Sequence, residues 1–173
     1  MKRGFRVIAA FFVLLPLLVG SCMNGNDDIP NFNEQLEQDI AVIDNYLTAK
    51  NITNVIKDNS GIRLVIHVDS VTGSKPTVDS CVTANYQGLL LATEQEFDKG
   101  INISFPLSDV IHGWRIGIPL LNEGDSATLY IPSGYGYGYY GYPPEIPSNA
   151  NLIFRVALKK VGETYKSSDR SCD

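Results

Sequence analysis

Cysteine, histidine and tryptophan are scarce in this chain, whose 173 residues contain three cysteines, two histidines and one tryptophan. The cysteines form no C-x-x-C motif, and only His67 and His112 could supply imidazole ligands. No metal-ligand cluster is visible, so we expect no metal and no metal catalysis. Three cysteines are also too few for a disulfide framework, although Cys81 and Cys172 could pair in an oxidising compartment.

Basic residues are outnumbered by acidic ones, with 14 Lys and Arg against 19 Asp and Glu. A protein with a net charge of −5 has no electrostatic reason to hold nucleic acid, so we exclude that partner. Long hydrophobic runs are absent beyond the N-terminus. The near-average composition, 44% hydrophobic and 19% charged, predicts one globular domain with additional segments.

Residues 1–21 are predicted to be a targeting segment, with basic residues at its start and an apolar run at 7–19 that is short for a membrane span. The run ends in Leu18-Val19-Gly20-Ser21-Cys22. This ending resembles the bacterial lipobox, in which the cysteine becomes the lipidated first residue of the mature protein. An ordinary secretory signal is the alternative. Removal of residues 1–21 would change the net charge from −5 to −8.

The lipobox resemblance implies acyl chains on Cys22, which would anchor the protein to a membrane of the cell envelope. The aspartate that usually retains such proteins in the inner membrane is absent, because Met23 follows Cys22. We therefore expect the outer membrane, on its periplasmic face or at the cell surface. Residues 22–30 are polar and end in proline, which predicts a flexible tether.

Residues 31–51 are predicted to form one amphipathic helix. Apolar side chains recur at helical spacing, at Phe32, Leu36, Ile40, Ile43 and Leu47. The other faces carry polar side chains, at Glu34, Glu37, Gln38, Asp39 and Asp44. Asn31 with Glu34 resembles a capping box, and Asn51 can close the C-terminus. The apolar stripe must be buried, against the following domain, which we favour, or against a second copy in a homodimer.

Residues 61–162 alternate as strands do, with glycine and proline between the runs, and a polar tail follows at 163–173. The single tryptophan stands in Val110-Ile111-His112-Gly113-Trp114. A large ring beside stiff β-branched residues fits a small apolar pocket or a core tryptophan at a corner. Residues 133–142 interleave glycines with tyrosines, which fits a low-complexity surface loop or an ordered aromatic flap.

Seven short motifs follow one another at suitable spacing across residues 61–162. They are Ala84-Asn85-Tyr86-Gln87-Gly88, Phe97-Asp98, Phe105-Pro106-Leu107, Val110 to Trp114, Asn122-Glu123-Gly124-Asp125, the run from Ile131 to Gly138 and the run from Ile146 to Phe154. Together they resemble an FKBP-type peptidyl-prolyl cis-trans isomerase (EC 5.2.1.8) of the bacterial envelope. The resemblance implies an α+β fold, a bent antiparallel β-sheet wrapped around a short helix, here preceded by the N-terminal amphipathic helix.

The resemblance also implies an apolar pocket that needs no cofactor. Its catalytic residues would be Tyr86, Phe97, Asp98, Ile111, Trp114, Tyr137 and Phe154. Substrate-binding residues would be Ile103, Val110, Tyr142 and Ile146. Trp114 would lie under the proline ring, Ile111 N–H and the Tyr137 hydroxyl would donate to substrate carbonyls, and Tyr86 would hold Asp98. The alternative for Asp98 is a turn-forming aspartate whose side chain accepts a hydrogen bond from the backbone that follows it.

The function expected from this resemblance is rotation of X-Pro bonds in proline-containing polypeptides of the envelope or in secreted proteins. The alternative is a module or chaperone that binds proline-containing partners with little turnover. A scaffold role of the tyrosine-rich segment is a third reading, which the intact Trp114, Tyr137 and Asp98 disfavour.

Overall fold

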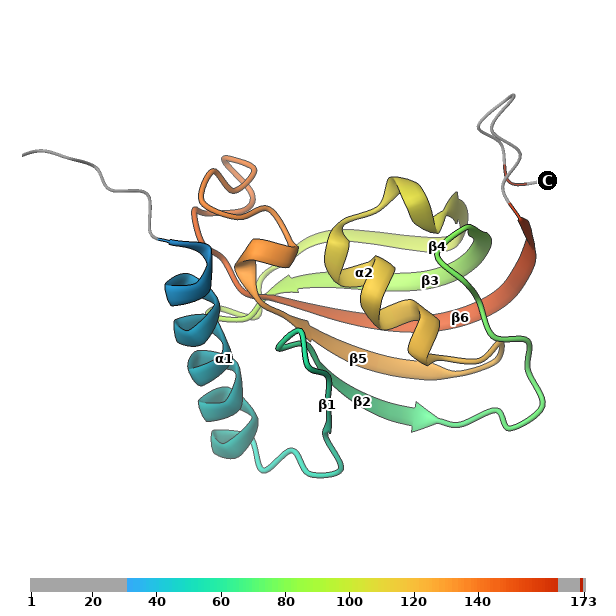
Figure 1. Ribbon diagram of the computed structural model, residues 1–173, viewed down its shortest axis with the longest axis horizontal. Helices are drawn as coiled ribbons and strands as arrows, with labels where there is room; N and C mark the ends of the chain where they lie inside the picture. The colour runs from blue at the N-terminus through green and yellow to red at the C-terminus, as the bar shows by residue number, and fades with distance from the viewer. Residues whose placement is uncertain (1–30, 165–171, 173) are drawn as a thin grey trace, which may run out of the picture.

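A six-stranded antiparallel sheet forms the body of the molecule in the computed structural model, which describes residues 31–164 and residue 172 (Figure 1). The strands lie in the order β1-β2-β5-β6-β3-β4. The predicted signal peptide, tether, lipidated Cys22 and most of the polar tail lie outside the described residues. The elements are α1 (Phe32–Ala49), β1 (Ile56–Lys57), β2 (Arg63–Val68), β3 (Ser80–Leu90), β4 (Glu96–Pro106), η1 (Leu107–Asp109), α2 (His112–Gly117), η2 (Ile118–Leu120), β5 (Ser126–Ile131), η3 (Ser133–Tyr135) and β6 (Leu152–Thr164).

The inner strands β2, β5, β6 and β3 bury apolar residues on both faces, because α2 lies on one face and α1 covers part of the other. Successive side chains of a strand point to opposite faces. Leu129 in β5 and Phe154 in β6 therefore join one buried cluster with Trp114 of α2, while Tyr130 and Ile153 join a second cluster. Figure 1 shows α2 lying across the first face of the sheet. Helix α2 packs closely on β5, since Gly113 and Gly117 lie against Ile131 and Leu129.

Helix α1 covers one end of the second face. Its residues Ile43 and Leu47 are buried there against Val65, Tyr130 and Ile153. The favoured prediction for the apolar stripe, packing against the following domain, is confirmed. At the ends of the helix, Asn31 Oδ1 accepts a hydrogen bond from Asn33 N–H at 3.0 Å, and Asn51 takes a left-handed conformation with φ 54°. Among the described residues, Glu34 makes no reciprocal capping bond.

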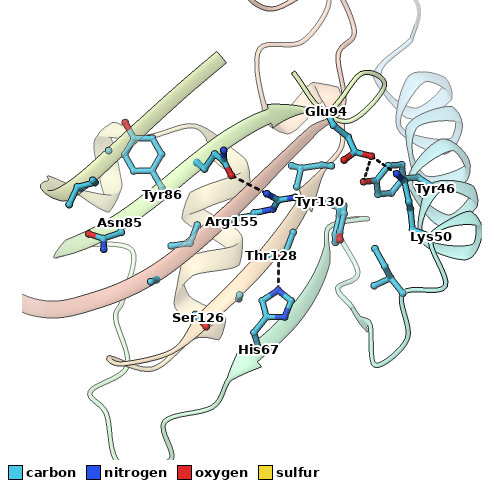
Figure 2. Close-up of a pocket in the computed structure, with 18 residues that line it drawn as sticks. Tyr46, Lys50, His67, Asn85, Tyr86, Glu94, Ser126, Thr128, Tyr130 and Arg155 are labelled. Carbon is cyan, nitrogen blue, oxygen red and sulfur yellow. Dashed lines mark hydrogen bonds and ion pairs between the residues drawn. The ribbon is translucent and has the colours of Figure 1, made fainter. Parts of the chain in front are cut away.

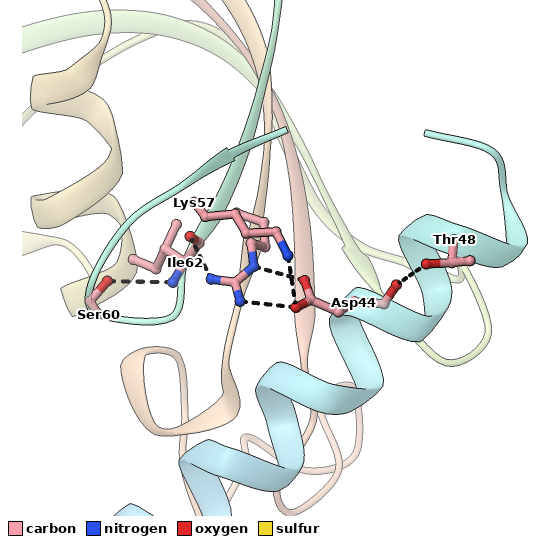
Figure 3. A network of polar contacts seen from close by, with 6 residues as sticks. Asp44, Thr48, Lys57, Ser60 and Ile62 are labelled. Carbon is pink, nitrogen blue, oxygen red and sulfur yellow. Dashed lines mark hydrogen bonds and ion pairs between the residues drawn. The ribbon is translucent and has the colours of Figure 1, made fainter. Parts of the chain in front are cut away.

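The carboxylate of Asp44 ties α1 to the first two strands (Figure 3). Oδ1 accepts from Arg63 Nε at 2.8 Å, and Oδ2 accepts from Arg63 Nη2 at 3.1 Å and from Lys57 Nζ at 3.2 Å. The side chain of Arg63 is only 8% exposed, so Asp44 neutralises an almost buried cation. The hydrogen bonds from Arg63 and Lys57 lower the pKa of Asp44.

Cys81 and Cys172 form a disulfide, which joins the start of β3 to the C-terminal end of the chain. The sequence left this pairing open. Strand β6 continues to Thr164, past the boundary expected at residue 162. Within the described part of the chain, no helix has the length and apolar character needed to cross a membrane.

Candidate active site

A hollow of about 270 Å³ opens on the α2 side of the sheet. Its lining comes from two strands at one side of the sheet, from β6, from the segment 105–114 and from the loop after η3. The lining residues are Tyr86, Asp98, Phe105, Asp109, Val110, Ile111, Trp114, Tyr137 and Phe154. Residues far apart in the sequence therefore meet at one mostly apolar site.

Trp114 is the centre of the aromatic packing and is only 4% exposed. Its ring centroid lies 5.3 Å from that of Tyr86, 5.2 Å from that of Phe105 and 5.2 Å from that of Phe154. All three neighbours meet it edge to face, the geometry that aromatic pairs prefer. The sequence left open a pocket or a core position, and Trp114 occupies both, since it lines the hollow and belongs to the core.

Phe97 closes the wall of the hollow next to Phe154. The Phe97 ring lies 5.6 Å from the ring of Phe154 and 6.4 Å from the ring of Tyr137. Edge-to-face packing of these rings therefore fixes this wall of the hollow.

The polar corner of the hollow consists of Tyr86 and Asp98. The Tyr86 hydroxyl donates to Asp98 Oδ2 at 3.0 Å, so Asp98 is an acceptor in the site. Burial, followed by this hydrogen bond to a carboxylate, raises the pKa of Tyr86 to about 12. The phenol therefore keeps its proton at any physiological pH and stays a hydrogen-bond donor.

The buried Trp114 Nε1–H has no hydrogen-bond partner in the described part of the chain, and two further donors at the hollow have none either. Ile111 is the N-cap residue of α2, and its carbonyl accepts from Trp114 N–H at 3.0 Å and from Arg115 N–H at 3.2 Å. Its own N–H donates to no described residue, as expected at a helix start. The Tyr137 hydroxyl also makes no hydrogen bond to a described residue, and burial raises the pKa of Tyr137. A ligand in the hollow can therefore use both donors.

Residues 133–149, hereafter the tyrosine loop, form an ordered flap rather than a low-complexity segment. Gly138 and Gly141 take left-handed φ values of 59° and 63°, which glycine adopts without strain. The Tyr142 N–H donates to the Ile146 carbonyl at 2.8 Å, and the Ile146 N–H returns the bond at 2.9 Å. The loop thereby holds Tyr137 over the hollow.

The structure brings most of the predicted site residues together. Six of the seven predicted catalytic residues line the hollow, and Phe97 reaches it through its ring contacts. Val110 lines it as well. Tyr142, whose ring lies 6.1 Å from that of Tyr137, and Ile103 are not among the lining residues; they are 64% and 44% exposed. Their roles stay predictions.

Ile146 is not among the lining residues of the hollow; it is 2% exposed and belongs to the same core cluster as Trp114 and Phe154, and its role in substrate binding stays a prediction. Its pairing with Tyr142 places the side chain inward, where it supports the loop. Sequence reasoning missed two lining residues, Phe105 and Asp109. Phe105 follows Ile101 and Ile103 in an alternating strand pattern, so the sequence did indicate that it shares a face with the predicted residue Ile103. Asp109 carries no such signal.

A second hollow, of about 670 Å³, lies on the other face of the sheet beside the end of α1 (Figure 2). Polar side chains pair at this hollow: Arg155 Nη1 donates to Gln87 Oε1 at 3.1 Å, and His67 Nε2 lies 2.8 Å from Thr128 Oγ1. Tyr86 borders both hollows, and no other predicted site residue lines this one. Among the described residues, no three His, Cys, Asp or Glu side chains gather as a metal site requires.

Comparison with known proteins shows the family of the chain. Residues 72–159, about half of the chain, match the family model of FKBP-type peptidyl-prolyl cis-trans isomerases. The chain belongs to this family. Its domain is therefore an FKBP-type peptidyl-prolyl cis-trans isomerase, EC 5.2.1.8.

Relatives of this FKBP-type domain come from bacteria and fungi. A probable FKBP-type isomerase of Neisseria meningitidis, FkpA, is 43% identical over 93 residues, which are 52% of this chain and 34% of that protein. FK506-binding protein 1 of Saccharomyces cerevisiae is 37% identical over 116 residues, 64% of this chain and 99% of that protein. The chain thus spans about a third of the Neisseria protein and nearly all of the yeast one.

Solved structures confirm the expected fold. The crystal structure of FkpA from Escherichia coli matches with a TM-score of 0.62 and 30% identity, covering 75% of this chain and 63% of that chain. An isomerase from Pseudomonas syringae pv. tomato matches with a TM-score of 0.64 and 24% identity, covering 78% of this chain and 98% of that chain. The FKBP-like sheet around a short helix, preceded by the N-terminal helix, is confirmed.

Proposed function

We propose that this protein is an envelope-anchored isomerase that rotates X-Pro bonds by binding the twisted bond in the hollow around Trp114. The observation that carries the proposal is the combination of an aromatic hollow with two donors, Ile111 N–H and the Tyr137 hydroxyl, that no described residue uses. Proline-containing polypeptides of the envelope or in the course of secretion are its substrates.

The chemistry suits an apolar site. Amide resonance sets a barrier of about 18–20 kcal/mol for rotation of a peptide bond, and X-Pro bonds isomerise over tens to hundreds of seconds. The twisted transition state loses this resonance and the charge separation that accompanies it. A site that excludes water therefore favours the twisted form over the planar one. Rotation breaks no covalent bond, so it requires no nucleophile.

The predicted catalytic residues have roles in this mechanism that their positions support. Trp114 lies under the proline ring, with Phe154 and Phe97 as one wall. The Ile111 N–H and the Tyr137 hydroxyl donate to carbonyls on either side of the bond. Tyr86, which stays protonated, orients Asp98 and keeps that carboxylate at the edge of the hollow.

The test of the activity is a protease-coupled isomerisation assay on the full-length protein, with peptides that vary the residue before proline, in the absence and presence of FK506. Several relatives are named for binding this macrolide. We expect turnover that FK506 inhibits, with a measurable preference among the peptides. Binding of FK506 without turnover would replace the isomerase proposal by the binding-module alternative, and absence of both would overturn the assignment of the hollow.

The envelope anchor rests on the lipobox-like sequence before Cys22 and on the polar stretch after it. We expect mass spectrometry of the mature N-terminus to find an acylated Cys22, and fractionation to place the protein in the outer membrane. The variant Cys22→Ala should release an unprocessed or soluble form. An N-terminus cleaved elsewhere, without acyl chains, would favour the ordinary secretory signal instead.

A homodimer through α1 is the less favoured arrangement, because the buried side of the helix is used within the chain. Phe32 and Val42, exposed by 48% and 49%, are the large apolar residues of α1 that a second copy could meet. Sedimentation of the full-length protein in detergent distinguishes monomer from dimer.

A further inference from the structure

A buried carboxylate lies where α1 meets the tyrosine loop. Asp39 of α1 is 2% exposed, and Ser133, which begins η3, is fully buried. Asp39 Oδ2 accepts from the Ser133 N–H at 2.8 Å and from the Ser133 hydroxyl at 2.6 Å, while Gln35 Nε2 donates to Oδ1 at 2.9 Å. A buried carboxylate is costly unless donors surround it, so these bonds define the position of both partners.

Ser133 is also hydrogen-bonded to the backbone on both sides of Tyr137. Its N–H also meets Asn151 Oδ1 at 3.0 Å. Its carbonyl accepts from Gly136 N–H at 2.9 Å and from Gly138 N–H at 2.8 Å, on either side of Tyr137. Ser133 alone therefore connects Asp39 to the backbone next to Tyr137.

A second contact between α1 and the loop adjoins the first. The Phe32 ring meets the ring of Tyr135 edge to face, with centroids 5.7 Å apart. Gly134 lies so close to Phe32 that a Cβ atom there would be 2.6 Å from Cε2. In Figure 1 the first half of α1 lies beside this loop. Helix α1 lies outside residues 72–159, the part of the chain that matches the family model, yet it packs against that part.

We propose that Asp39 is a positioning residue for isomerisation: through Ser133 it fixes the tyrosine loop and with it the Tyr137 hydroxyl at the mouth of the hollow. The inference rests on the role proposed above for Tyr137. Because Tyr137 would bind the substrate carbonyl in the ground state and the transition state alike, loosening the loop should raise KM and leave kcat nearly unchanged.

The experiment compares Asp39→Ala with Asp44→Ala in the full-length protein. Both residues hold α1 to the domain, but Asp44 contacts Lys57 of β1 and Arg63 of β2 (Figure 3), whereas Asp39 contacts Ser133 of η3. We expect Asp39→Ala to raise KM for an X-Pro peptide by about five- to tenfold with kcat within about twofold. Asp39→Asn, which retains one acceptor oxygen, should restore part of the loss. Asp44→Ala should lower thermal stability with KM unchanged.

Hydrogen exchange gives a readout that does not depend on activity. The Gly138 and Asn149 amides, bonded at 2.8 Å to Ser133 O and at 2.9 Å to Gly138 O, should exchange faster in Asp39→Ala and at the wild-type rate in Asp44→Ala. If Asp39→Ala does not fold, Ser133→Ala removes the hydroxyl donor alone and should show a smaller change in the same direction.

Two outcomes would overturn the proposal: equal KM values for the two aspartate variants, or unchanged exchange at Gly138 and Asn149 in Asp39→Ala. Failure of the proposed function has a different signature. In that case Tyr137→Phe leaves KM at the wild-type value, even though the exchange rates in Asp39→Ala still rise.

Discussion

Gly88 lies in β3 beneath two rings of the active site, and replacing it by alanine is expected to deform the hollow. It pairs with Asp98 in β4 and with Phe154 in β6. A Cβ atom at this position would lie 2.8 Å from Phe97 Cζ and 2.9 Å from Phe154 Cε1, closer than carbon atoms pack. Phe154 cannot move away, because it is 4% exposed and is held between Trp114 and Phe97. Phe97 must therefore be displaced.

The magnitude follows from overpacking of a close-packed site, which costs about 1–3 kcal/mol per added methyl group. We expect the free energy of unfolding of Gly88→Ala to fall by about 1–2 kcal/mol. Displacement of the Phe97 ring from the wall should lower kcat/KM by about tenfold, the equivalent of about 1.4 kcal/mol. Urea denaturation measures the first quantity, and the coupled isomerisation assay measures the second.

Gly162→Ala is the matched control. A Cβ atom there would lie 3.4 Å from the Cys81 carbonyl oxygen and 3.6 Å from Cys81 Cβ, which are ordinary contacts. We expect its stability to change by less than about 0.5 kcal/mol and its activity to stay at the wild-type level. If Gly88→Ala retains the kcat/KM of Gly162→Ala, the rings of Phe97 and Phe154 do not form the working wall of the site.

Three further predictions concern electrostatics and the disulfide. Asp44→Asn should lower the free energy of unfolding at pH 7 by about 1–3 kcal/mol, because the nearly buried Arg63 loses its carboxylate. The pKa of Asp44 is lower in the folded state than its ordinary value of 3.8. The stability that wild type has over Asp44→Asn is therefore fully present above pH 3.8 and is lost as the pH falls through the folded-state pKa. Urea denaturation at pH 7 and pH 2 checks this, and a difference of equal size at both pH values would contradict it. Tyr86→Phe should lower kcat/KM by about fivefold through loss of one hydrogen bond. The ratio should be constant from pH 6 to 9, since the pKa of Tyr86 is about 12; a ratio that varies over this range in pH–rate profiles would show that another group titrates with it. Cys172→Ser should lower stability by up to about 4–5 kcal/mol, the loop-closure entropy of a disulfide spanning 91 residues, and thermal unfolding midpoints equal to wild type would count against the bond.

Local patterns in the sequence predict much of this fold. The apolar residues of 31–51 repeat at helical spacing, and α1 occupies Phe32–Ala49. The family resemblance of the motifs around Tyr86, Trp114 and Tyr137 implies a common pocket, and these residues do line one hollow. Such features depend on short-range periodicity and on recurring motifs, both of which can be read along the chain.

Contacts between distant segments could not be predicted in the same way. Helical spacing places Asp39 among polar neighbours on an exposed side, yet it is buried by Ser133, 94 residues further along the chain. Val65 and Tyr130 alternate with the core positions of their strands and would face solvent if α1 did not cover them. The motif that contains Ile146 does not indicate that this residue forms a bridge with Tyr142 or that its side chain is 2% exposed.

The most direct test of the central claim is the rate of cis-trans exchange in an X-Pro peptide, measured by NMR with wild-type protein and with the double variant Trp114→Leu, Phe154→Ala. The account predicts that wild type accelerates exchange and that the double variant abolishes the acceleration while circular dichroism still detects α1. Acceleration at the wild-type rate in the folded double variant would contradict the claim that the hollow around Trp114 is the site of catalysis.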